Sequence, residues 1–294
     1  MMLTNNIHDV ALIFEGGGMR ASYTAGIVKT LLENELYFDY VAGISAGASH
    51  CVNYLSRDKE RVERSFVDFV LDPNFGGWKS LLKGDGYFHA QYIYEETPLP
   101  DSVLPFDFQT FMDNPAQMRI GVFDLERAQT VYYSKKDIHV LKDLMKIVRS
   151  SSSLPIMMPP TQYNNHLYID GGVACGIPLE VAKKDGFKKF FVVLTRERGF
   201  RRKPLKFKTA IKAFYQKFPE TVEALANRHL LYNQTLDELE DLAAAGYACI
   251  IYPDVMPVTA YETDYEQLKK SYALGYMQGQ RDCEVWKYFL SKYY

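Results

Sequence analysis

The stretch Val41-Ala-Gly-Ile-Ser-Ala-Gly-Ala48 contains the pattern Gly43-x-Ser45-x-Gly47 and decides how the first part of the chain folds. Apolar residues precede the serine and helix-compatible residues follow it, which predicts a sharp turn from a strand into a helix. The two glycines let these elements approach without clashes between Cβ atoms. The Ser45 hydroxyl would then stand exposed at a helix N-terminus, where the helix dipole favours negative charge. Ser45 is therefore a candidate nucleophile.

The segments before this turn show the same alternation of strand and helix. Residues 10–14, Val-Ala-Leu-Ile-Phe, form an apolar run typical of a strand buried on both faces, and Gly16-Gly-Gly18 follows closely. Helices are expected over residues 20–32 and 46–55, with a second strand over 38–42. Strands that alternate with helices build parallel sheets, so we predict a three-layer α/β/α fold with a central, mainly parallel sheet.

The rest of the chain predicts additions to this sheet. Residues 72–115 are rich in proline, glycine and aromatic residues, which indicates an irregular insertion, and a hairpin over 118–133 would add antiparallel strands. We expect one domain over residues 1–294, with a motif-bearing core over about 10–195 and a C-terminal helical and strand extension over about 196–294. The remaining expected elements are helices over 138–148, 178–184, 205–245 and 264–288 and strands over 190–194 and 248–252.

The composition, with 47% hydrophobic and 24% charged residues, is typical of a soluble globular protein. No apolar run approaches the ~18 residues that a membrane-spanning helix needs, and the first residues lack the positively charged start of a secretory signal. We therefore expect a cytoplasmic protein that at most touches a membrane surface. A net charge of -2 argues against a surface built to bind nucleic acid.

The cysteines indicate neither disulfides nor a metal site. Cys51, Cys175, Cys249 and Cys283 are far apart, form no C-x-x-C pair and have no histidine cluster near them. They are expected to be reduced, mostly buried thiols. We expect no metal ion and no cofactor.

The run Gly16, Gly17 and Gly18 predicts an oxyanion-binding loop. Glycine N–H groups can converge on one point before a helix N-terminus, and one such donor contributes on the order of 10²–10³ in rate. Arg20 would add a positive charge near an oxyanion or a phosphate, although an exposed or salt-bridged helix residue fits the sequence equally well. The run also matches a dinucleotide fingerprint, Gly16-x-Gly18-x-x-Ala21, but no acid ends the second strand to hold a ribose.

Ser45 needs a base, and the histidines are poorly placed to act as one. His50 lies one helical turn beyond the serine, His229 falls within a helical pattern, and His166 leads into Asp170-Gly-Gly172. Asp170 ends an apolar strand, and the glycines after it allow another loop to approach. In a direct pair with serine, Asp170 would need burial to raise its pKa above ~3.9. A simple Asp-Gly turn is the competing interpretation.

Four blocks of the sequence together resemble the patatin-like phospholipases, and the chain looks like a bacterial member of that family. The resemblance covers residues from about 10 to 195. The glycine block departs from the family pattern at Ala21, where a glycine is usual, and an alanine is tolerable at a helix start. The blocks are Phe14-Glu-Gly-Gly-Gly-Met-Arg20, Gly43-Ile-Ser-Ala-Gly47, Ser150-Ser-Ser-Ser-Leu-Pro-Ile-Met-Met-Pro-Pro160 and Tyr168-Ile-Asp-Gly-Gly-Val-Ala-Cys-Gly-Ile-Pro178.

The resemblance implies a Ser–Asp dyad without histidine, with Ser45 as nucleophile, Asp170 as base and Gly16, Gly17 and Gly18 in the oxyanion loop. It also implies hydrolysis of fatty acyl esters through an acyl-enzyme. Residues 150–160 would line the acyl site, for which Leu154, Ile156, Met157 and Met158 are suitably flexible and apolar. Ordinary core packing is the competing role for these four residues.

A basic segment over residues 196–217 contains nine lysines or arginines and one acid, Glu197. Four apolar residues share one helical face, as in an interfacial helix beside anionic lipid headgroups. A helix with this face on the protein core fits the pattern better. The four residues are Phe207, Ile211, Phe214 and Phe218, and Lys206, Lys208, Lys212 and Lys217 lie mostly off their face.

The sequence thus predicts a serine acyl-ester hydrolase of the phospholipase A or lysophospholipase type. Its expected partners are a lipid acyl-ester substrate and, transiently, a membrane surface, with no nucleic acid. Two alternatives remain open: a general carboxylesterase with a Ser45–Asp170–His229 triad, and a catalytically silent lipid-binding protein.

Overall fold

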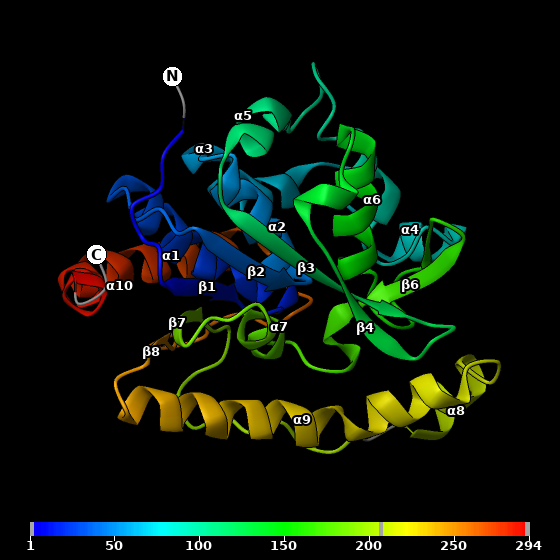
Figure 1. The fold of residues 1–294 in the computed structure, drawn as a ribbon. Helices are drawn as coiled ribbons and strands as arrows, with labels where there is room; N and C mark the ends of the chain where they lie inside the picture. Colours follow the sequence, from blue (N-terminus) through cyan, green and yellow to red (C-terminus); the bar gives the residue numbers. More distant parts are fainter. Residues whose placement is uncertain (1–2, 206–207, 292–294) are drawn as a thin grey trace.

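The protein is built on one mixed, mostly parallel sheet (Figure 1). The computed structural model describes residues 3–205 and 208–291, and in these residues the strand order is β5-β6-β3-β2-β1-β7-β8, with β4 also paired to β3. Strands β3, β2, β1, β7 and β8 run parallel, while β4, β5 and β6 are antiparallel to their neighbours. The strands are β1 (Val10–Phe14), β2 (Tyr40–Ile44), β3 (Gln117–Asp124), β4 (Gln129–Tyr133), β5 (Thr161–Tyr163), β6 (His166–Asp170), β7 (Lys189–Val193) and β8 (Ala248–Ile251).

Helices cover both faces of the sheet, which confirms the predicted α/β/α layers. Strand β1 is buried throughout because Val10, Leu12 and Phe14 face one layer while Ala11 and Ile13 face the other. In Figure 1 the long helix α9 runs beneath the sheet. One layer contains α1 (Ala21–Glu33), α2 (Ala46–Leu55), α3 (Lys59–Phe66), α6 (Leu141–Ser152) and α10 (Tyr265–Ser291), and the other contains α7 (Leu179–Lys184) and α9 (Pro219–Ala244).

Strand β3 positions the two strand ends that matter for the site. Along one edge, β3 pairs in parallel with β2 as far as Gly121, which stands opposite Ile44. Its next residue, Val122, stands opposite Asp170 of the antiparallel strand β6. Strand β4 occupies the other edge of β3. The C-terminal ends of β2 and β6 therefore point at each other, and Ser45, directly after β2, meets Asp170.

The C-terminal region completes the same sheet and the same helical layer. Strand β8 pairs with β7, and α10 packs along α1. A Cβ on Gly275 would lie 1.9 Å from Tyr23 O, and one on Gly26 would lie 2.2 Å from Tyr276 N. The two helices thus touch at their backbones, a closeness that only glycine permits.

The predicted irregular insertion over residues 72–115 is wrong in part, because it contains short helices. These are α4 (Trp78–Lys83), the π-helical turn η3 (Tyr92–Glu96) and α5 (Phe108–Asp113). Aromatic contacts order the segment: Phe75 packs edge-on against both Phe69 and Phe88. These apolar side chains supply a local core that the proline and glycine content did not indicate.

The helix expected over residues 138–148 begins later and ends later, at Leu141 and Ser152. The serines that were expected to end it instead continue it, because the Ser150 hydroxyl donates to Lys146 O at 2.7 Å and so has a partner inside the helix. Helix α3 and strand β5 were not predicted at all.

The basic segment folds only partly in the way that the better-fitting interpretation predicted, because one residue of the expected core face is exposed. Helix α8 (Lys208–Phe214) buries Ile211, and the following Tyr215 joins the same core cluster, while Phe214 is 53% exposed. Lys206 and Phe207 lie outside the described residues. Across the described part of the chain, no helix is both long enough and apolar enough to cross a membrane.

Candidate active site

Ser45 occupies a strained turn between β2 and α2, with φ 58° and ψ -127°. A conformation of this kind costs ~1–3 kcal/mol and persists only where the surroundings fix it. The backbone around the turn is packed so closely that glycine is required at two positions. A Cβ on Gly43 would lie 2.2 Å from Gly47 O, and a Cβ on Gly47 would lie 2.3 Å from Phe14 O. The turn presents the Ser45 side chain at the N-terminus of α2.

The Ser45 hydroxyl donates a hydrogen bond to Asp170 Oδ2, with an Oγ–Oδ2 distance of 2.5 Å. The other carboxylate oxygen, Oδ1, accepts the Gly172 N–H at 2.7 Å, and the Asp170 N–H donates to Ser153 O at 2.9 Å. Both side chains are buried, at 5% exposure for Ser45 and 3% for Asp170. The carboxylate is therefore fixed in orientation toward the hydroxyl.

The environment of Asp170 makes it a stronger base than an exposed aspartate. Burial raises the pKa of its carboxyl above the ordinary 3.8, while the hydrogen bond from Ser45 and the charge of Arg228 oppose that rise. Arg228 approaches from α9, with its Nη2 3.0 Å from the place where a Cβ of Gly172 would stand. Burial lowers the pKa of Arg228 to about 10, so its guanidinium keeps its positive charge at neutral pH.

The glycine loop lies beside the serine but offers fewer donors than its sequence predicts. The Gly16 N–H already donates to Gly176 O at 3.0 Å, whereas the N–H groups of Gly17 and Gly18 have no acceptor among the described residues. Gly18 has φ +56°, and a Cβ there would lie 2.4 Å from Ala260 O. The Ala46 N–H, at the first residue of α2, has no intrahelical acceptor either. Free backbone donors therefore flank the hydroxyl.

No histidine nitrogen in the described part of the chain hydrogen bonds to Ser45. His50 Nε2 pairs with Thr24 Oγ1 at 2.8 Å, and burial lowers the pKa of His50 to about 3, so the ring is neutral. His229 Nδ1 lies 2.9 Å from Ala226 O on its own helix. His166 lies beside Asp124 and Glu126 instead, in a group that could hold a metal ion.

An apolar cavity opens beside Ser45, with about 930 Å³ of empty space that includes space open to solvent. Every residue that lines it falls between Gly18 and Met158. The insertion supplies much of its wall, and α6 supplies another part through Leu144 and Val148. A cavity with this apolar lining fits an alkyl chain. The insertion residues that line it are Phe75, Phe88, Ile93, Tyr94, Pro98, Leu104 and Phe106.

The predicted substrate-binding residues are only partly at this cavity. Leu154 and Met158 line it, while Met157 and Ile156 do not, and Ile156 is 44% exposed. Arg20 does not line it either: its side chain is buried, and its Nε donates to Thr195 O at 3.1 Å. Hydrophobicity alone could not separate these residues, because which side of a loop faces the cavity depends on the surrounding fold.

A model of the family described as patatin-like phospholipase matches residues 12–183, which is more than half of the chain. The chain belongs to the patatin-like phospholipase family. A second model, described as a domain of unknown function (DUF6363), matches residues 218–291. The family match covers the serine turn, the glycine loop and Asp170.

Relatives of this patatin-like chain are distant and longer. It is 23% identical to the uncharacterized protein YjjU of Escherichia coli K12, over 63% of this chain and 52% of YjjU. It is 24% identical to mouse patatin-like phospholipase domain-containing protein 7, over 97% of this chain and 21% of the relative. Lysophospholipase NTE1 of Meyerozyma guilliermondii is 23% identical, over 95% of this chain and 19% of the relative.

The chain thus spans about half of the length of YjjU and about a fifth of the other two. Among solved structures, VipD from Legionella pneumophila matches with a TM-score of 0.51 and 13% identity, over 97% of this chain and 67% of VipD. At this identity the likeness supports the patatin fold alone.

Two residues of this patatin-like site were not predicted from the sequence. Ser151 accepts the Ser45 N–H at 2.8 Å and donates to Gly121 O at 2.6 Å, so it ties the serine turn to β3. Tyr94 lines the cavity, and burial together with the charge of Asp170 raises the pKa of its phenol. The serine run was a usable signal for Ser151, while nothing local distinguishes Tyr94 from its aromatic neighbours.

Proposed function

We propose that this patatin-like chain is a serine hydrolase of lipid acyl esters, of the phospholipase A or lysophospholipase type, with Ser45 and Asp170 as its catalytic dyad. The observation that carries the proposal is the 2.5 Å hydrogen bond between the two side chains, at the wall of an apolar cavity. The family match supports the reaction class, and a relative that bears the name lysophospholipase supports the substrate class.

In the first step, Ser45 Oγ attacks the ester carbonyl carbon while its proton passes to Asp170 Oδ2. The tetrahedral oxyanion that forms is stabilised by the N–H groups of Gly17, Gly18 and Ala46 and by the N-terminus of α2. Collapse of this intermediate breaks the carbon–oxygen bond to the alcohol, which takes the proton from Asp170. The acyl chain then remains on Ser45 with its alkyl part in the cavity.

In the second step, water repeats the sequence on the acyl-enzyme. Asp170 takes a proton from the water as its oxygen attacks, and returns that proton to Ser45 Oγ as the fatty acid leaves. The strained Ser45 conformation keeps the Oγ in position for both steps, since the Ser151 hydrogen bond fixes the Ser45 backbone.

The protein would reach its substrate at a membrane surface through transient contact, from a cytoplasmic location. The exposed Phe214 stands between the exposed Lys212 and Lys217, a combination that favours an anionic lipid surface. Ile211, on the same face of α8, is used for internal packing, so Phe214 is left to make this contact and the contact is weak.

The proposal is tested by incubating the protein with a mixed lipid extract and following released fatty acids by mass spectrometry, for the wild type, Ser45→Ala and Asp170→Asn. A fluorophosphonate probe is applied in parallel. We expect a Ser45-dependent adduct and fatty acid release that both substitutions remove.

Each alternative gives a different result. A chain that is labelled at Ser45 and hydrolyses short chromogenic esters but no lipid would be a general carboxylesterase. A correctly folded chain that shows neither adduct nor turnover would be a catalytically silent lipid-binding protein.

A further inference from the structure

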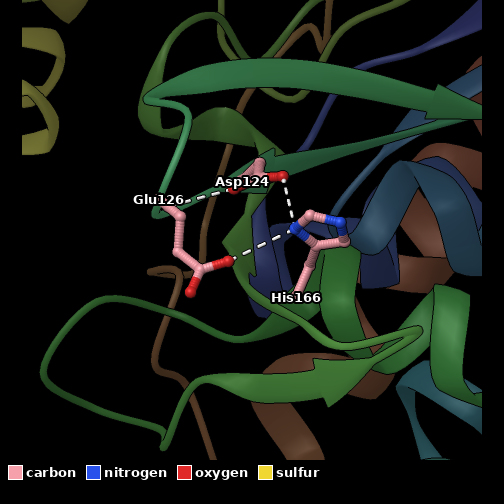
Figure 2. Close-up of side chains that lie close together, drawn as sticks. All are labelled: Asp124, Glu126 and His166. Atoms are coloured by element: carbon pink, nitrogen blue, oxygen red, sulfur yellow. Dashed lines mark hydrogen bonds and ion pairs between the residues drawn. The ribbon is translucent and has the colours of Figure 1, made fainter.

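Asp124, Glu126 and His166 converge at the end of the β3–β6 pairing, outside the catalytic dyad (Figure 2). Asp124 ends β3, Glu126 lies in the turn that follows, and His166 begins β6. One ligand atom from each residue lies within 4.8 Å of the other two. His166 is separated from the two acids by about forty residues, so no local sequence pattern connects them.

Two distances within this cluster agree with those between ligands around a metal ion. His166 Nδ1 lies 3.4 Å from Asp124 Oδ2 and 3.3 Å from Glu126 Oε2. The contact with Glu126 is a long hydrogen bond, since a direct hydrogen bond between an imidazolium and a carboxylate is usually about 2.7–2.9 Å. Zinc binds nitrogen and oxygen ligands at about 2.0–2.2 Å, and on a tetrahedron such ligands stand about 3.3–3.5 Å apart. Both measured separations agree with this geometry.

The carboxylate of Asp124 has one oxygen that no hydrogen bond satisfies, although the His166 ring and the Arg127 guanidinium lie near it. Its side chain is completely buried, and its Oδ2, which points at His166, has no hydrogen-bond partner among the described residues. Its Oδ1 accepts the N–H groups of Glu126 and Arg127, both at 3.0 Å, which fixes the orientation of the carboxylate. A buried carboxylate oxygen without a donor is costly unless a cation binds it.

We propose that Asp124, Glu126 and His166 bind a zinc ion, with a fourth position open to solvent. Imidazole ligands favour zinc over calcium or magnesium, and two carboxylates complete a three-residue set. Glu126 is 49% exposed at its side chain and His166 27%, so the ion can enter from solvent. The site departs from the sequence-based expectation that the chain binds no metal.

The ion would strengthen the short β3–β6 pairing that carries Asp170. Only three residue pairs join these strands, the last being Asp124 opposite Tyr168. Asp170 lies four residues after His166 on the same strand. The zinc would hold β6 against β3 by binding His166 and Asp124 together, and it takes no part in the chemistry at Ser45.

One neighbouring cation competes with the metal. Arg127 Nε lies 3.9 Å from Asp124 Oδ2, and the Arg127 side chain is 56% exposed, so it can turn toward solvent. Its removal by Arg127→Ala is expected to tighten zinc binding roughly 2–5-fold.

The test is titration of chelator-treated protein with zinc chloride by calorimetry, with native mass spectrometry for the stoichiometry. We expect one zinc per wild-type chain, and at least ~10-fold weaker binding by His166→Ala and Glu126→Gln. His139→Ala, which removes an exposed histidine outside the cluster, is the matched control and retains wild-type binding. Saturating zinc should raise the melting temperature of the wild type and leave that of His166→Ala unchanged.

Wild-type protein that takes up no zinc would overturn the proposal, as would equal binding by the wild type and His166→Ala. Preferential binding of calcium or magnesium by the same residues would overturn the assignment to zinc. The substituted residues are partly exposed, and circular dichroism checks that each variant folds. None of these readouts depends on hydrolase activity.

Discussion

The segment over residues 12–183, which matches the patatin family, and the segment over 218–291, which matches a domain of unknown function, contribute to the protein in different ways. The first contains both residues of the proposed dyad, the glycine loop and every residue that lines the cavity. The second contributes α10 against α1 and Arg228 beside the base. The proposed chemistry thus depends on short motifs of one region, while the other region supplies packing contacts and a charge that no sequence motif predicts.

The largest expected effect tests whether the chemistry belongs to the first region alone. Ser45→Ala is expected to lower kcat/KM for an acyl ester by on the order of 10⁴-fold or more, because the nucleophile is lost. Asp170→Asn, which retains the shape but not the basicity, should cost about 10²–10⁴-fold. Steady-state hydrolysis of a chromogenic ester measures both.

His229→Ala, in the second region, is the control for this prediction. His229 contacts only its own helix in the hydrogen bonds described, so activity should stay within about twofold of the wild type. An inactive His229→Ala together with an active Asp170→Asn would contradict the dyad and restore the triad.

The second prediction concerns the packing that the C-terminal region provides. Gly275→Ala would gain up to ~1 kcal/mol from helix propensity, but its Cβ would stand 1.9 Å from Tyr23 O. The clash should prevail and lower the free energy of unfolding by about 1–3 kcal/mol, as measured by urea denaturation. Gly176→Ala, where a Cβ meets nothing within 4 Å, should change it by less than ~0.5 kcal/mol. Equal effects of the two substitutions would show that α10 is not tightly docked.

Local sequence patterns predict features that depend on neighbouring residues and miss those that depend on distant ones, and the pairing of Ser45 with Asp170 was expected only from the family resemblance. The bounds of β1 and α2 match their predictions, because a continuous apolar run and a serine between glycines act over a few positions. Whether Gly16 has a free N–H depends instead on Gly176, far along the chain. The meeting of Asp124 with His166 likewise follows from the register between β3 and β6, which no local pattern encodes.

The third prediction asks whether substrate choice also belongs to the first region. Met158→Phe adds bulk to the cavity wall and should lower kcat/KM about 10-fold for long acyl chains relative to short ones. Phe214→Ser, in the exposed part of α8, should leave the chain-length profile unchanged and reduce only the binding to anionic vesicles. Sedimentation with vesicles and a series of acyl esters measure the two effects. A changed chain-length profile in Phe214→Ser would contradict the idea that the first region alone determines which acyl chains are hydrolysed.

The smallest expected effect comes from Arg228, which belongs to the second region but lies beside Asp170 of the first. Asp170 must be ionised to accept the serine proton, so the acid limb of the pH–kcat/KM profile follows its pKa. Burial raises that pKa and the charge of Arg228 lowers it, so Arg228→Met should move the acid limb to higher pH without changing the plateau rate greatly. Arg201→Met, which removes an arginine paired with Asp237 and Glu240 at the surface, should leave the limb in place. If Arg228→Met instead lowered the rate equally at every pH, its role would be to hold the Gly172 loop in position. The C-terminal region would then act on the dyad through packing alone. If the charge of Arg228 shifts the pKa of Asp170, the effect of its removal on the rate must depend on pH.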